Sequence, residues 1–166
     1  MHADGNYYDS IAEGYEELHK EEQLKKIAII KQHFSPSPKE RLLDVGCGSG
    51  ITTGPWGCQR YGIDPSRELI RKAVAKDKGI KYLIAAAENI PFPNGFFDHV
   101  ISITAIQNFD DIEKGLQEIK RVGKYSFVLT FLKKSKKKEM IEKLIKKHFT
   151  ISKIIEEEKD MVYFCS

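Results

Sequence analysis

Short apolar segments alternate with amphipathic segments along most of the chain. Apolar runs of about four to eight residues that end at glycine, proline or an acid are typical of buried strands, whereas apolar residues at every third or fourth position are typical of helices. The strands predicted from this pattern are 41–45, 60–64, 81–85, 99–104, 125–132, 151–156 and 161–165. The predicted helices are 65–76, about 111–121, and 136–148, with Pro65 in the first turn of the first one.

This alternation predicts an α/β fold with a mainly parallel sheet of seven strands and helices on both faces. The last two strands are joined only by a short acidic turn, so they should form an antiparallel hairpin at one edge. A sheet of this kind binds ligands beyond the carboxyl ends of its strands, where the strand order reverses. The alternation of strands and helices alone thus predicts a ligand site at the carboxyl edge of the sheet.

The first 34 residues stand apart in the sequence. They are rich in Glu and Lys, and apolar residues such as Ile27 and Ile30 recur at helical spacing near the end, which predicts a helix. The prolines within 35–38 end that helix, because a residue before proline avoids the helical conformation. We therefore expect an N-terminal helical segment over 1–34 and a ligand-binding region over 35–166, within one structural domain overall.

The composition is that of an ordinary globular domain: of 166 residues, 41% are hydrophobic and 31% are charged. No apolar run approaches the roughly 18 residues of a membrane span, and the first residues lack the layout of a signal peptide. The cysteines Cys47, Cys58 and Cys165 contain no C-x-x-C pair, which argues against a disulfide framework or zinc site and favours a reducing cytoplasm. The net charge of +3 does not require a nucleic-acid partner.

Three alternating glycines, Gly46, Gly48 and Gly50, follow the first predicted strand, which ends in an acid and a valine. Glycines allow a tight turn and let a ligand approach the backbone closely. The pattern alone is weak evidence, since nucleotide-binding dehydrogenases use a related loop and an ordinary strand-to-helix turn is a further alternative. Asp64 ends the second strand, fourteen positions after Gly50. An acid there can accept hydrogen bonds from ribose hydroxyls, which we favour over the alternative of a helix N-cap.

Four segments, in this order, resemble those of one enzyme family. Leu42–Gly50 is similar to motif I, and Tyr61–Ser66 to motif II, of class I S-adenosylmethionine-dependent methyltransferases. Ala86–Asp98 resembles a segment of their type 11 subgroup, which includes the ubiquinone/menaquinone-biosynthesis type, and Tyr8–Ala12 with Tyr15 resembles its N-terminal signature. The resemblance implies a single Rossmann-like domain, S-adenosyl-L-methionine as cofactor and S-adenosyl-L-homocysteine as product.

The resemblance also implies roles for individual residues. The loop glycines would face the methionine and ribose parts of the cofactor, with Asp44 ordering the loop, and Asp64 would hold the ribose hydroxyls. Ala87–Glu88 would lie beside the adenine, and Thr104 would line the passage to the methyl group. Tyr8 would close over the methionine end as part of an N-terminal lid. The cofactor-binding set is Tyr8, Asp44, Gly46, Cys47, Gly48, Gly50, Asp64, Pro65, Ala87, Glu88 and Thr104.

Departures from the family pattern indicate a trimmed version of the fold. Only ten residues separate Gly50 from Tyr61, where the family usually has a full helix. Ala86 stands where the family often has an acid for the adenine amino group. The helix often inserted before the last two strands is absent. Gln107-Asn108 replaces a common His-His pair after the fourth strand, so these residues are candidate acceptor contacts, with loop capping as an equal alternative.

A sulfonium methyl is already activated, so in-line placement of a nucleophile supplies much of the acceleration. No catalytic residue and no metal site are therefore assigned. The chain lacks the Asn/Asp-Pro-Pro-Tyr/Phe motif of enzymes that methylate exocyclic amines or glutamine amides, which disfavours methylation of base amino groups. The leading hypothesis is methyl transfer to a small molecule. A cofactor-binding protein without activity is a second class of hypothesis, and a dehydrogenase is the weakest.

The segment Lys133–Lys147 holds eight lysines and two glutamates. One interpretation is an RNA-facing patch, as in a tRNA or rRNA methyltransferase that works with a partner subunit. The favoured interpretation is the solvated face of an amphipathic helix, because Ile141, Leu144 and Ile145 form an apolar stripe and no aromatic residues interleave with the lysines. No membrane or DNA partner is expected, and the oligomeric state stays open.

Overall fold

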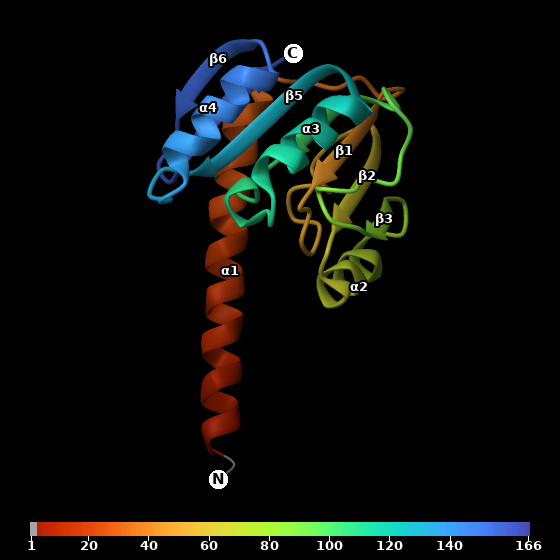
Figure 1. The fold of residues 1–166 in the computed structure, drawn as a ribbon. Coiled ribbons are helices and arrows are strands. Elements are labelled where there is room, and N and C mark those ends of the chain that lie inside the picture. The colour runs from red at the N-terminus through yellow and green to blue at the C-terminus, as the bar shows by residue number, and fades with distance from the viewer. Residues whose placement is uncertain (1–2) are drawn as a thin grey trace. The chain divides into compact units, whose positions relative to one another are not determined.

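The computed structural model describes the backbone of residues 3–166 and the side chains of residues 14–166. Its centre is a seven-stranded sheet with the order β3-β2-β1-β4-β5-β7-β6 (Figure 1). The strands are β1 (Arg41–Val45), β2 (Gln59–Asp64), β3 (Lys81–Ile84), β4 (Phe97–Ser102), β5 (Gly123–Leu132), β6 (Ile151–Glu156) and β7 (Asp160–Cys165). The first five strands pair in parallel, and β7 runs antiparallel to β5 and β6. The predicted α/β fold with a C-terminal hairpin is confirmed.

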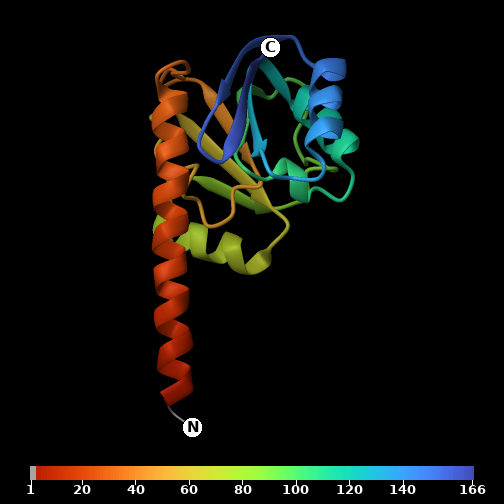
Figure 2. The same ribbon diagram turned by 90° about the vertical axis from the view of Figure 1, so that its left-hand side faces the viewer.

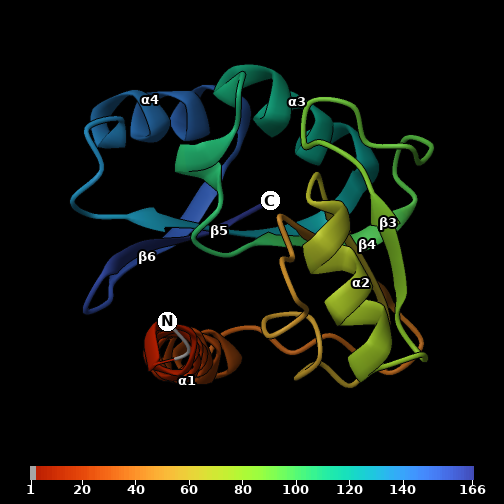
Figure 3. The same ribbon diagram turned by 90° about the horizontal axis from the view of Figure 1, so that it is seen from below.

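Three helices cover the two faces of this sheet: α2 (Arg67–Lys76), α3 (Ile112–Val122) and α4 (Lys138–His148). The strand order reverses between β1 and β4, so right-handed crossovers place α2 on one face and α3 and α4 on the other (Figure 3). Helices α3 and α4 lie side by side (Figure 2). Lys147 Nζ of α4 donates to Glu113 Oε1 of α3 at 2.8 Å.

The hydrophobic core lies between the central strands and these two helices. Leu43 of β1, Val100 of β4 and Leu129 of β5 are fully buried. Leu116 and Ile119 of α3 pack against the same cluster and are also fully buried. Central strands of a parallel sheet are covered on both faces, which explains why these segments are continuous apolar runs in the sequence.

All predicted strands and helices after residue 40 end within two residues of the observed bounds. The local expectation for Pro65 is wrong, however. Helix α2 begins at Arg67, and its N-cap is Ser66, whose Oγ accepts from Leu69 N at 3.2 Å. Pro65 therefore precedes the cap instead of lying in the first turn, because the Ser66 hydroxyl satisfies a free N–H of that turn better than proline can.

The segment between the glycine loop and β2 forms turns instead of a helix, as its ten-residue length suggested. Trp56 is buried within it, and its Nε1 donates to Thr52 O at 2.9 Å. The indole therefore stabilises the return of the chain toward β2.

The chain divides into two compact units between Ser35 and Pro36. The first contains α1 (Ala3–Lys31), the helix expected over residues 1–34. Within α1, Lys26 Nζ donates to Gln23 Oε1 at 2.8 Å, one turn away. None of the helices described for this chain combines the length and the apolar character that crossing a membrane demands.

Candidate functional site

The glycine loop, residues 46–50, leaves the carboxyl end of β1. Gly46, Gly48 and Gly50 have φ angles of 77°, 54° and 89°, in the left-handed region that side chains other than glycine rarely adopt. The N–H groups of Gly46 and Cys47 both donate to Ile63 O of β2, at 2.9 and 3.0 Å. A Cβ at Gly46 would lie 2.5 Å from Ala105 Cβ. Glycine at this position thus lets the loop pack directly against the segment that follows β4.

The space around Gly48 is different. Apart from Gly48 itself and its two neighbours in the chain, no described protein atom lies within 4 Å of the position that a Cβ would take at Gly48. A cofactor can therefore approach the backbone here without displacing a side chain of residues 14–166, which is the property expected of a ligand-binding glycine.

Asp44 holds the glycine loop from within the sheet. Its carboxylate is fully buried, and its Oδ2 accepts from Thr52 Oγ1 at 2.6 Å and from Thr53 Oγ1 at 2.7 Å. These bonds fix the two ends of the loop to each other. Burial raises the pKa of the Asp44 carboxyl from 3.8 to about 6, although the two hydroxyls oppose this effect.

This shift predicts a pH effect on stability. The Asp44 carboxyl holds its proton more tightly in the folded state than in the unfolded state. Its protonation therefore stabilises the fold fully below the unfolded pKa of 3.8, and this stabilisation is lost as the pH rises through the folded pKa of about 6. Asp44→Asn cannot ionise. The variant should therefore gain unfolding free energy relative to the unmodified chain between pH 4 and 7, by on the order of 3 kcal/mol. Urea unfolding of both proteins across this range tests the effect, and a difference that stays constant with pH would contradict it.

Asp64 lies at the end of β2 beside the glycine loop and is 8% exposed. Its Oδ2 accepts from Gly48 N at 3.0 Å, and its Oδ1 accepts from Ser66 N at 2.9 Å. The alternative that Asp64 is the N-cap of α2 is wrong, because Ser66 has that role. The carboxylate instead joins the glycine loop to the chain that leads into α2, and each oxygen keeps a lone pair for a further donor.

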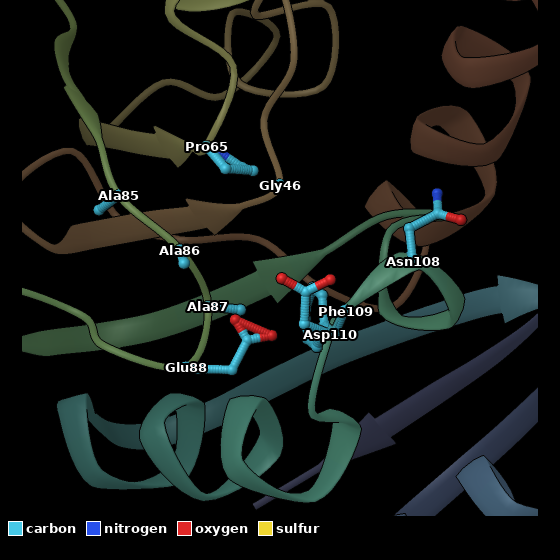
Figure 4. Close-up of a pocket in the computed structure, with 9 residues that line it drawn as sticks. All are labelled: Gly46, Pro65, Ala85, Ala86, Ala87, Glu88, Asn108, Phe109 and Asp110. Atoms are coloured by element: carbon cyan, nitrogen blue, oxygen red, sulfur yellow. The ribbon is translucent and has the colours of Figure 1, made fainter.

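A pocket of about 110 Å³ opens next to this loop (Figure 4). It lies at the carboxyl edge of the sheet, between the chain ends that leave β1, β2, β3 and β4. Its lining residues are Gly46, Pro65, Ala85, Ala86, Ala87, Glu88, Asn108, Phe109 and Asp110. Glu88 Oε1 also accepts from Asp111 N at 3.3 Å, which ties two of the lining segments together.

The pocket brings together five residues of the expected site, namely Gly46, Pro65, Ala87, Glu88 and Asn108. It adds Ala85, Ala86, Phe109 and Asp110, which sequence reasoning did not assign. All four follow the carboxyl ends of β3 and β4, so the rule that ligands bind at this edge was the signal that could have found them.

Thr104 takes part in a buried network instead of lining the pocket. Its φ of 56° is the one positive value of a non-glycine residue within the described backbone. Thr104 N donates to Thr130 Oγ1 at 2.8 Å, and Thr104 Oγ1 donates to Asp160 Oδ2 at 2.6 Å. Thr130 Oγ1 donates to the same Asp160 oxygen at 2.8 Å, and both Thr130 and Asp160 are fully buried. Strands β5 and β7 thus fix the start of the segment after β4.

We name residues 103–110, the segment after β4, the acceptor loop. Gln107 and Asn108 lie in its short helix η1 (Ile106–Asn108). Gln107 Nε2 donates to Thr104 O at 2.8 Å. Its Oε1 is buried and accepts no hydrogen bond from the residues described. Gln107 therefore closes the turn of the acceptor loop, as the capping alternative expected, while Asn108 is exposed at the pocket.

Tyr8 lies outside the residues whose side chains the structure describes. The N-terminal lid therefore stays a prediction.

Comparison with known proteins agrees with this geometry. A family model for a methyltransferase domain matches residues 43–127, from β1 to β5. An uncharacterised protein of Methanocaldococcus jannaschii is 30% identical, over 92% of this chain and 66% of its own length. The ubiquinone/menaquinone biosynthesis C-methyltransferase of Rickettsia bellii is 29% identical, over 80% of this chain and 56% of its own length. The chain thus spans less than two thirds of either relative.

The fold also matches a solved structure. An S-adenosylmethionine-dependent methyltransferase of Aquifex aeolicus superposes with a TM-score of 0.71 at 19% identity, over 84% of this chain and 88% of that one. The matched segment 43–127 contains the glycine loop, Asp64 and all of the pocket lining. The chain belongs to the methyltransferase-domain family, within the type 11 group of class I S-adenosylmethionine-dependent methyltransferases.

Proposed function

We propose that this chain binds S-adenosylmethionine over the glycine loop and transfers its methyl group to a small-molecule acceptor. The strongest support for this proposal is the open space above Gly48, which lies next to the carboxylate of Asp64 at the point where the strand order reverses. The match to a methyltransferase-domain model over the same residues supports it.

The residues around the loop fit this cofactor. A carboxylate offers about four lone-pair positions, and Asp64 uses two of them for Gly48 N and Ser66 N. The remaining positions suit the ribose hydroxyls. The small side chains of Ala85, Ala86 and Ala87 line the pocket in which the adenine would lie. Gly46 and Gly48 admit the methionine part, and Tyr8, in the helical segment 1–34, would close over it.

When bound, the cofactor supplies a methyl group activated by a positively charged sulfur. The chain then has to orient an acceptor and exclude water, which can account for much of the rate. The acceptor loop can hold an acceptor in a fixed orientation, because Thr104 at its start is hydrogen-bonded to Thr130 and Asp160 of two further strands. Gln107 keeps the turn of this loop closed through its hydrogen bond to Thr104 O. Asn108, which is exposed at the pocket, would contact the acceptor.

Mass spectrometry with a deuterium-methyl-labelled cofactor tests the transfer. The protein is incubated with labelled S-adenosylmethionine and the low-molecular-mass fraction of its native cell extract, and in parallel with total RNA. We expect one labelled small molecule, absent when Gly48→Val protein is used. Label in the RNA digest alone would replace the small-molecule acceptor by RNA. If neither the small molecules nor the RNA carried the label, although the protein binds the cofactor, this result would indicate a protein without methyltransferase activity.

A further inference from the structure

A group of lysines borders the acceptor loop. We name residues 133–138, which join β5 to α4, the basic loop; its lysines are Lys133, Lys134, Lys136, Lys137 and Lys138. Because β5 runs parallel to β4, the basic loop leaves the sheet at the same edge as the acceptor loop. Lys137 Nζ donates to Gln107 O at 3.2 Å, and η1 contacts both β5 and α4. The positive charge thus lies beside the candidate acceptor contacts.

Most of this charge is not neutralised within the fold. Lys133 forms an ion pair with Glu156 at 3.3 Å, and Lys137 binds a neutral carbonyl. The side chains of Lys134, Lys136 and Lys138 form no hydrogen bond or ion pair with residues 14–166. An ammonium group without a carboxylate partner is available to an external anion.

Helix stability does not explain these lysines either. Lys137 is the N-cap of α4 and makes no side-chain capping bond, and Lys138 is the first helical residue. Cations at the N-terminus of a helix oppose its dipole, whereas Ser, Asp or Asn at the cap would stabilise it. The positive charge is therefore placed against the local preference, beside the acceptor loop.

We propose that the basic loop selects an acceptor that carries an anionic group, the carboxylate or phosphate of a small molecule. This inference rests on the proposed function, because it names the class of acceptor for that site. The lysines would anchor the anionic group while the nucleophilic atom of the same molecule faces the methyl donor. Lysine suits such a role, since its compact charge accepts different anion geometries.

The surroundings favour a small anion over RNA. The basic loop contains no aromatic residue on which a base could stack. Two carboxylates, of Glu88 and Asp110, border the neighbouring pocket and would repel a polyanion lying across the site. The anionic group of a small acceptor needs to contact the basic loop alone.

Titration of the ¹⁵N-labelled protein with inorganic pyrophosphate, in the presence and absence of S-adenosylhomocysteine, tests this proposal. We expect saturable chemical-shift changes at the amides of the basic loop and of Gln107 and Asn108. The variant Lys134→Gln/Lys136→Gln/Lys138→Gln should bind pyrophosphate roughly tenfold more weakly, because three ammonium partners are lost. The control Lys143→Gln/Lys146→Gln/Lys153→Gln removes the same net charge from exposed positions elsewhere and should change the affinity less than about twofold.

Equal weakening in both variants, or shifts confined to residues away from the basic loop, would overturn the proposal. So would binding of tRNA that the basic-loop variant abolishes while pyrophosphate causes no shifts, since this result would assign the loop to RNA. Binding of S-adenosylhomocysteine is read in the same samples from the amides of the glycine loop. Its absence would contradict the proposed function separately, whatever the pyrophosphate result.

Discussion

Replacing Gly48 by valine should abolish measurable binding of S-adenosylhomocysteine and leave the chain folded. Apart from the adjoining residues in the chain, no described atom lies within 4 Å of the new Cβ, so the side chain would enter the open space above the loop instead of the protein core. The φ of 54° adds about 1–2 kcal/mol of backbone strain, which a domain of ordinary stability tolerates. We expect affinity to fall by more than roughly 100-fold, because the branched side chain takes up space that the cofactor needs.

The matched control is Gly57→Val. Gly57 is exposed, also has no described atom near its Cβ position, and lies outside the left-handed region. Calorimetry should show unchanged binding in this control, and circular dichroism should show native helix content in both variants. If folded Gly48→Val protein bound S-adenosylhomocysteine like the unmodified chain, the glycine loop would not be the cofactor site.

The second large effect is expected at Asp64. Asp64→Ala should weaken cofactor binding by about 1.5–3 kcal/mol, the range for hydrogen bonds to a charged group, or roughly 10- to 150-fold. The substitution also removes the acceptors of Gly48 N and Ser66 N, so the unfolding free energy should fall as well. Calorimetry and urea unfolding separate these two effects.

Asp64→Asn is the control for this substitution. It keeps the size of the side chain and one oxygen acceptor but loses the charge, so its affinity should lie between those of Asp64→Ala and the unmodified chain. An unchanged dissociation constant in Asp64→Ala would mean that the carboxylate only fixes the backbone between β2 and α2.

The fold was predictable because most of its signals are local. Buried parallel strands correspond to short apolar runs in the sequence, and the amphipathic segments between them have helical periodicity. The error at Pro65 is also local: Pro65 and Ser66 were both compatible with the start of α2, and the Ser66 hydroxyl bond to Leu69 N decides between them. The site could be placed at the carboxyl edge because the topology follows from the order of the elements.

The hydrogen bonds that hold the site in place could not be predicted, because they join residues that are distant in the sequence. Thr104 meets Asp160 only because β4, β5 and β7 are neighbours in the sheet, and 56 positions separate the two residues. In the sequence, Asp160 is one of several acids in a turn. The bonds from Thr52 and Thr53 to Asp44 likewise depend on the path of a loop that has no periodic pattern.

The lysine-rich segment illustrates the same difference. The sequence favoured a solvated helix face, and α4 does bury the apolar stripe of Ile141 and Ile145. The contact between Lys137 and Gln107 O spans 30 positions and joins the segment to the acceptor loop. Charge composition alone does not predict this contact, because the contact depends on the parallel pairing of β4 and β5, which brings the two loops to the same edge of the sheet.

Calorimetry of the unmodified chain with three ligands tests the central claim most directly. S-adenosylmethionine, S-adenosylhomocysteine and NAD are titrated separately under identical conditions. The glycine loop, Asp64 and the alanine-lined pocket predict saturable binding of both sulfur compounds and no heat from NAD beyond dilution. Saturable binding of NAD with no response to either sulfur compound would contradict the assignment of this site to methyl transfer.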